Sequence, residues 1–167
     1  YDNLDVTDKW ILSRTNVMVK EMTDIFDKFL LHEAPGRAID FIINEVSRWY
    51  IMVIRDRVEE QYEGEDKKSA LWTLWYVLYR SALALSPITP MLTEKLYQLI
   101  FREGLPNNMK ESMSLEDWPK VDEKYIDQTI EDQMELSRKI IDVSRKLKQE
   151  NNIKLRWQSK ALYLLYK

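Results

Sequence analysis

Apolar residues recur every three to four positions through most of this chain, and this spacing constrains the fold more than any other feature of the sequence. Residues three and four apart lie on one face of an α-helix, so the pattern predicts helices that each bury one side. Residues that interrupt helices are scarce, with only 3 glycines and 5 prolines among 167 residues. Sandwiches and barrels need many turns, so the sequence predicts an all-α fold.

Start and stop signals divide the pattern into five expected helices, covering about 7–31, 37–62, 65–86, 90–102 and 122–151. Thr7 is the expected N-cap of the first helix. The break before the second is expected at residues 34–36, and Pro87 ends the third. Thr89 and Pro90 resemble an N-cap followed by the first residue of the fourth helix.

Two stretches depart from the helical pattern. Residues 103–119 are rich in Gly, Pro and Asn, which predicts a long crossing loop that Leu115 and Trp118 pin to the bundle. Residues 153–157 and 161–166 resemble the strands of a hairpin, which is marginally stable alone. The expected architecture is a bundle of four to five helices in residues 1–152, and then a truncated C-terminal β-hairpin that begins a strand-containing module at 153–167.

The sequence offers little to an enzyme. It has one histidine, His32, no cysteine, and no nucleotide-binding, zinc-protease or serine-hydrolase motif. A di-iron bundle needs two Glu-x-x-His motifs, which one histidine cannot supply. We therefore expect no catalytic residue, no metal site and no cofactor. No apolar run approaches the roughly 18 residues of a membrane span, and the lack of cysteine suits a reducing, cytoplasmic setting.

Basic residues concentrate near the C-terminus, although the net charge of the chain is −3. Residues 138–167 contain nine Lys or Arg and two acidic residues. This asymmetry favours contact with a polyanion, and the alternative is a solvated basic helix end. The candidate contacts are Arg145, Lys148, Lys154 and Arg156.

Arginines also recur along the second expected helix. At 100° per residue, Arg37, Arg48 and Arg55 fall on one face of this helix. The opposite, core-facing side would then carry Ile42, Val46, Trp49 and Val53, with Tyr50 at its edge. Arginine grips phosphate through its planar fork and stacks on bases, so the stripe indicates RNA contact; a merely solvated surface is the alternative.

One arginine of the same helix is expected to be structural. Arg57 falls on the apolar side, where a charged group must be paired. We therefore expect it to bridge to an acidic side chain of another helix.

Several motifs resemble the anticodon-binding domain of class I aminoacyl-tRNA synthetases specific for isoleucine, valine and leucine. They occur in the family's order and cover nearly the whole chain: 8–14 (DKWILSR), 47–51 (SRWYI), 55–57 (RDR), 86–90 (SPITP) with Glu94 and Tyr97, 112–119 (SMSLEDWP) and 153–156 (IKLR). The isoleucine-specific members fit best. The valine- and leucine-specific members are the nearest alternatives, and a non-catalytic helical scaffold that binds a partner protein is a more distant one.

The resemblance implies a helical bundle that receives the anticodon stem-loop of a tRNA. It also implies that the chain is one domain of a larger ligase, whose separate catalytic domain uses ATP with magnesium to attach isoleucine to tRNA. The domain itself is expected to be monomeric, with tRNA as its partner.

Overall fold

The computed structural model describes residues 4–59, 61, 63–103 and 109–163, all of them helical or irregular. The chain divides into two compact units, Tyr1–Asp127 and Gln128–Lys167. Each unit is described by itself. In the described residues the predicted all-α class is confirmed, and none of them forms a strand.

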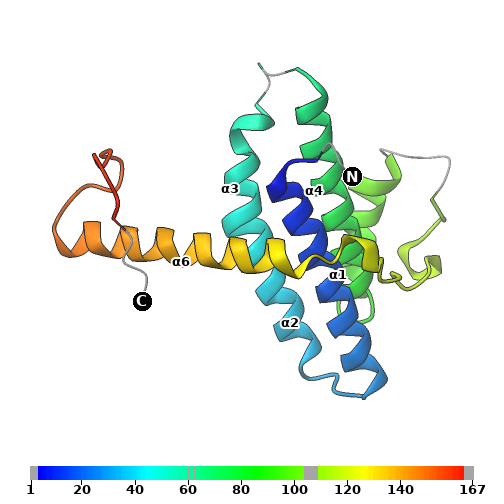
Figure 1. Cartoon of the computed structure of the whole chain (residues 1–167). Helices are drawn as coiled ribbons and strands as arrows, with labels where there is room; N and C mark the ends of the chain where they lie inside the picture. The colour runs from blue at the N-terminus through cyan, green and yellow to red at the C-terminus, as the bar shows by residue number, and fades with distance from the viewer. Residues whose placement is uncertain (1–3, 60, 62, 104–108, 164–167) are drawn as a thin grey trace. The chain divides into compact units, whose positions relative to one another are not determined.

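Unit 1 is built on three long helical segments that lie side by side (Figure 1). The first is α1 (Val6–Asp27). The second is a continuous rod made of α2 (Ala34–Asp40), the π-helix η1 (Phe41–Tyr50), α3 (Ile51–Ile54) and the 3₁₀ turn η2 (Arg55–Arg57). The third is α4 (Glu65–Leu85). A shorter helix, α5 (Pro90–Leu96), continues as the π-helix η3 (Tyr97–Arg102), and two 3₁₀ turns follow, η4 (Met113–Leu115) and η5 (Glu123–Tyr125).

The ends of α1 differ from the prediction. Asp5 is the N-cap, and its carboxylate accepts hydrogen bonds from both the amide and the hydroxyl of Thr7. The helix ends at Asp27 because Phe29 adopts a left-handed backbone conformation, with φ 57°. The amide of Leu30 then bonds to the carbonyl of Ile25, and that of Phe29 to Phe26, which is the Schellman arrangement without its usual glycine.

Two other helix starts also differ. The rod begins at Ala34 rather than Arg37, since Pro35 occupies its first turn, where a proline needs no amide hydrogen bond. The last helix begins at Gln128, six residues later than expected, after the separate turn η5. The start of α5 at Pro90, with Thr89 as N-cap, is confirmed, although the Thr89 side chain makes no capping hydrogen bond.

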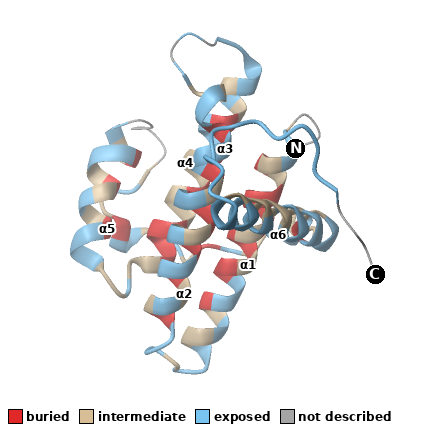
Figure 2. Ribbon diagram, turned by 90° about the vertical axis from the view of Figure 1, so that its left-hand side faces the viewer, coloured by how far each residue is buried: buried red, intermediate tan, exposed pale blue. Residues whose placement is uncertain are grey.

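The main core lies between α1, the rod and α4, where the buried faces meet (Figure 2). Its largest fully buried side chains include Ile11, Leu12, Met18 and Met22 of α1, Phe41, Tyr50 and Ile54 of the rod, and Val77 of α4. A second cluster joins the end of α4 to η3 and η4 through Leu83, Tyr97, Phe101 and Met113. Together these two clusters hold the elements of unit 1 in place.

The crossing loop is fastened to the bundle, as predicted, but only one of its two predicted pins is correct. The Trp118 indole nitrogen donates to the Thr23 hydroxyl at 2.9 Å, and its ring packs edge-on against Phe26 at 5.3 Å. Leu115 is 57% exposed, so that part of the prediction was wrong. Met113, two residues earlier in the 3₁₀ turn, is buried instead.

Carboxylates complete the attachment of the loop. Glu94 of α5 accepts hydrogen bonds from the Gln98 amide, the Ser112 hydroxyl and the Met113 backbone amide at 2.7–2.9 Å. These donors favour the ionised form, so the pKa of Glu94 lies below its usual range, with Gln98 as the largest cause. Glu116 accepts from the Tyr97 hydroxyl at 2.5 Å, and burial together with this carboxylate raises the pKa of Tyr97.

Unit 2 consists of α6 (Gln128–Glu150) and an irregular tail. The predicted stop at the Asn151–Asn152 pair is confirmed, since Asn152 has φ 55° and the amide of Ile153 bonds to the carbonyl of Lys148. The predicted hairpin was wrong over residues 153–163, where no strand forms; residues 164–166 lie outside the described part. The Lys148 ammonium donates to the carbonyls of Leu155 and Trp157, which removes acceptors that a strand pair would use.

Replacing Trp118 with Ala should destabilise unit 1 by about 3 kcal/mol, because a large part-buried ring and a hydrogen bond are lost together. Trp118→Phe keeps a ring against Phe26 and should cost about 1 kcal/mol. Urea denaturation followed by circular dichroism measures both. Leu115→Ala is the matched control and should stay within about 0.5 kcal/mol; a Trp118→Ala variant as stable as this control would contradict the pinning role.

The Glu94 contacts should make the loop sensitive to acid. Because the folded-state pKa of Glu94 is lowered, its stabilising effect is present above the ordinary glutamate pKa and is lost as the pH falls through the lowered value. The Met113 amide proton, followed by NMR, should shift and lose its protection from exchange, measured relative to the intrinsic rate at each pH, in that acidic window. The Glu94→Gln variant should lose this titration, and a persistent acid response in that variant would assign it to another group.

Candidate nucleic-acid interface

The rod that carries the candidate arginines is not a regular α-helix. Its central ten residues form a π-helix, in which hydrogen bonds run from each residue to the fifth one along. A π turn holds more residues than an α turn, so the 100° step used in the sequence prediction does not apply there. From Phe41 onward the buried apolar positions are Phe41, Val46, Tyr50 and Ile54, spaced four to five residues apart.

Because of this change in helix pitch, the buried face of the rod differs from the predicted one. Tyr50, expected at the edge of the core, is fully buried, and Val53, expected inside, is 41% exposed. Trp49 and Ile42 are only partly buried, and Val46 is buried as predicted.

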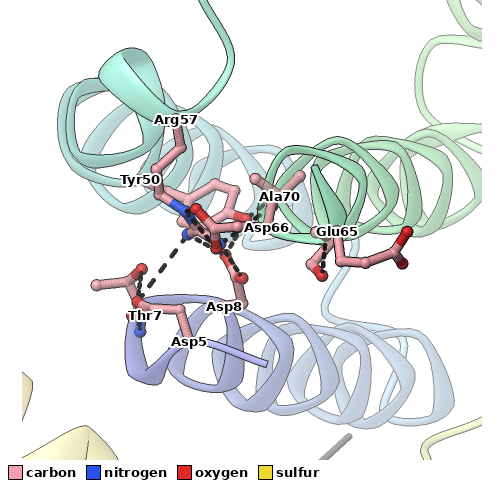
Figure 3. Close-up of polar contacts among 9 residues, drawn as sticks. Asp5, Thr7, Asp8, Tyr50, Arg57, Glu65, Asp66 and Ala70 are labelled. Atoms are coloured by element: carbon pink, nitrogen blue, oxygen red, sulfur yellow. Dashed lines mark hydrogen bonds and ion pairs between the residues drawn. The ribbon is translucent and has the colours of Figure 1, made fainter. Parts of the chain in front are cut away.

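The most buried charge in unit 1 lies where the end of the rod meets α1 and α4 (Figure 3). Arg57 donates to both carboxylate oxygens of Asp8, at 3.0 and 2.8 Å, and to Asp66 at 2.6–3.1 Å. The Asp8 side chain has no exposed surface, and the Tyr50 hydroxyl also donates to it, at 2.7 Å. The prediction that Arg57 bridges to an acidic residue of another helix is confirmed.

These contacts set the electrostatics of the cluster. Asp8, and then Asp66, hold the pKa of the Arg57 guanidinium above its already high usual value. Burial, reinforced by the neighbouring carboxylate of Asp8, raises the pKa of Tyr50. The tyrosine therefore stays a neutral donor and the arginine stays charged, so we assign the cluster a structural role.

Two further ion pairs join the rod to α1. Arg14 donates to both oxygens of the nearly buried Glu45, at 2.6 and 2.9 Å, and Arg37 pairs with Glu21. The paired residues follow one another along α1 in the order 8, 14 and 21, and their partners run backwards along the rod in the order 57, 45 and 37. The three pairs therefore fix the antiparallel register of the rod against α1.

The rod's candidate arginines differ in what they can offer to RNA. Arg37 is only 17% exposed and its Nε is held by Glu21, so little of its guanidinium faces solvent. Arg48 is exposed, with one contact to the Asn44 side chain at 2.9 Å. Arg55 is exposed, and no described residue forms an ion pair with it. Arg48 and Arg55 thus leave most of their donors available to a ligand.

The other candidates belong to unit 2. Arg145, Lys154 and Arg156 are exposed. Lys148 is partly buried, with its ammonium 2.6 Å from the carbonyl of Trp157. The candidates therefore form two groups, one on the rod of unit 1 and one around the end of α6.

Within the described residues, no helix combines the length and the apolar character that crossing a bilayer requires. These residues also bring together no group of three His, Cys, Asp or Glu side chains suited to a metal ion.

The chain belongs to the family of anticodon-binding domains of tRNA ligases, since the family described as "Anticodon-binding domain of tRNA ligase" matches residues 8–163. The resemblance seen in its motifs is thereby confirmed.

The relatives of this chain include the isoleucine–tRNA ligases of several organisms. The isoleucine–tRNA ligase of Pyrococcus abyssi is 38% identical over 157 residues, which cover 94% of this chain and 14% of the relative. That of Methanopyrus kandleri is 34% identical over 163 residues (98% and 15%), and that of Methanosarcina mazei is 36% identical over 156 (93% and 15%). The chain is thus homologous to one domain of isoleucine–tRNA ligases, and it spans about 15% of their length.

Arg57→Gln should destabilise unit 1 by about 3 kcal/mol, since it leaves the buried Asp8 carboxylate without its charge partner. Asp66→Asn is the matched control: the Asp66 side chain is 66% exposed, so its removal from the same arginine should cost less than about 1 kcal/mol. The urea midpoints of unfolding of the two variants, compared with that of the unaltered chain, measure both losses. Equal, small losses would show that the Asp8 carboxylate is satisfied without Arg57.

Proposed function

We propose that this chain binds the anticodon stem-loop of a tRNA as the anticodon-binding domain of an isoleucine–tRNA ligase. The observation that carries the proposal is the family match over residues 8–163, together with relatives that are isoleucine–tRNA ligases. The whole enzyme would attach isoleucine to its tRNA with ATP and magnesium. Those steps belong to the remainder of the ligase, which would work in the cytoplasm.

The rod supplies the first group of proposed contacts. Arg48 and Arg55 each present a planar guanidinium that can grip a phosphate oxygen pair. The ion pairs of Arg57 and Glu45 hold the rod against α1, so the two exposed arginines are carried on a rigid element. A rigid support reduces the ordering cost of binding.

Unit 2 supplies the second group, Arg145, Lys154 and Arg156, with Lys148 in a supporting position. Arg37 and Lys148 stay within the proposed interface, but each already has a partner inside the fold, Glu21 and the Trp157 carbonyl respectively. Their contribution should therefore be smaller than that of the exposed residues.

The proposed contacts can be tested by titrating tRNA with Arg48→Gln and Arg55→Gln across a salt series. Each lost phosphate contact should weaken binding and lower the slope of log K against log salt by roughly 0.7–0.9. Stability should change by less than about 0.5 kcal/mol, because both side chains are exposed.

Lys68→Gln is the matched control, because Lys68 is an exposed cation of α4 outside the rod, and it should leave the slope unchanged. If both arginine variants bind with the unaltered slope, the rod is solvated surface and unit 2 becomes the leading contact. If the unaltered chain shows no salt-dependent binding to tRNA, the proposed function itself is wrong.

A further inference from the structure

An exposed tryptophan lies in the most basic part of the chain. Trp157 is 55% exposed, in the tail that follows α6. Residues 145–160 contain six Lys or Arg and one acidic residue, Glu150. Exposing a large aromatic side chain forgoes the free energy of burying it, roughly 25 cal/mol per Å² of apolar surface. A ligand that covers the ring would recover part of it.

The tail around Trp157 has a defined local structure. The left-handed Asn152 turns the chain at the end of α6, and the Lys148 ammonium donates to the Trp157 carbonyl at 2.6 Å. The Trp157 amide bonds to the carbonyl of Lys154 at 2.9 Å, which closes a turn. The Lys154 ammonium lies 5.7 Å from the centre of the Trp157 ring. These contacts hold the backbone of the tryptophan and place a cation beside its ring.

The positive charge around Trp157 indicates which kind of ligand would cover its ring. The cores of protein–protein interfaces are depleted of lysine, whose ammonium must be desolvated there, and four of the six basic residues in 145–160 are lysines. Single-stranded nucleic acid instead combines flat bases, which stack on aromatic rings, with phosphates, which attract cations. Trp72, which is 47% exposed, lacks the basic setting: its ring stacks on Tyr76 and lines a pocket with Glu65 and Lys68, whose charges balance.

We propose that Trp157 is a stacking platform for an unpaired RNA nucleotide, with Lys154 and Arg156 contacting the phosphates that flank it. The proposal deepens the proposed function and rests on it, because it assigns a base contact within the tRNA-binding surface. Stacking on a π-face tolerates any base, so the platform contributes affinity for unpaired RNA rather than sequence readout.

The experiment compares Trp157→Leu and Trp157→Phe in the full 167-residue chain, with Trp72→Leu as the matched control. The probes are a synthetic anticodon stem-loop with a fluorescent 2-aminopurine in its unpaired loop, and a blunt RNA duplex of equal length. Trp157→Leu should weaken stem-loop binding at least about fivefold, as expected for one lost stacking contact. It should also abolish the quenching of 2-aminopurine on binding. Duplex affinity and the salt slope should not change.

Trp157→Phe should keep most of the affinity and of the quenching, since it retains an aromatic face, and Trp72→Leu should behave like the unaltered chain. Equal binding of the stem-loop by Trp157→Leu and the unaltered chain overturns the platform and leaves the proposed function standing. So does an equal loss for stem-loop and duplex, or a loss in Trp157→Phe as large as in Trp157→Leu. If the unaltered chain binds neither probe, the proposed function and the platform both fail.

Discussion

The ion pair between Asp8 and Arg57 is the contact on which the arrangement of unit 1 depends. It joins residues 49 positions apart, with a carboxylate that has no exposed surface. A buried charge of this kind is tolerated only while its partner is in place, so the start of α1 and the end of the rod are positioned together. Asp66 at the start of α4 contacts the same guanidinium, which brings the third long helix to the same point. The exposed Arg55 lies two residues before Arg57, so the same pair also positions a proposed phosphate contact.

Much of this fold could be predicted from the sequence, because burial and periodicity act locally. Arg57 was expected on the apolar side of the rod, where a charge needs a partner, and the pairing with Asp8 is confirmed although the regular pitch behind that expectation does not hold through Phe41–Tyr50. The π-helix from Phe41 to Tyr50 could not be predicted in this way. Its wider turn sets which side chains of the rod face α1, and no spacing within the rod reveals that packing. The misplacement of Tyr50 and Val53 follows from this one cause.

The motifs that carry the family resemblance serve mainly to hold the fold. Asp8, Tyr50 and Arg57 form one buried cluster, Glu94 and Tyr97 fasten the crossing loop, and Trp118 packs on α1. Such residues are constrained by several partners at once, which gives them recognisable spacing. Arg55 also lies in one of these motifs, 55–57, but no described residue forms an ion pair with it, so the resemblance alone does not say what it contacts. The resemblance therefore predicts the architecture more sharply than it predicts the individual RNA contacts.

The charge distribution shows what kind of RNA binding such a chain can support. The first 127 residues contain 16 Lys or Arg and 23 Asp or Glu, whereas the last 40 contain nine and five. Unit 1 is therefore net acidic and offers no long-range attraction to RNA. At physiological salt the screening length is about 8 Å, so a phosphate beside Arg48 or Arg55 interacts chiefly with that guanidinium and little with more distant carboxylates. Short-range bidentate contacts can thus act on an acidic unit, whereas the basic tail of unit 2 can attract RNA before contact. The basic tail of unit 2 would then attract RNA of any sequence, and Arg48 and Arg55 of unit 1 would make the short-range contacts with individual phosphates.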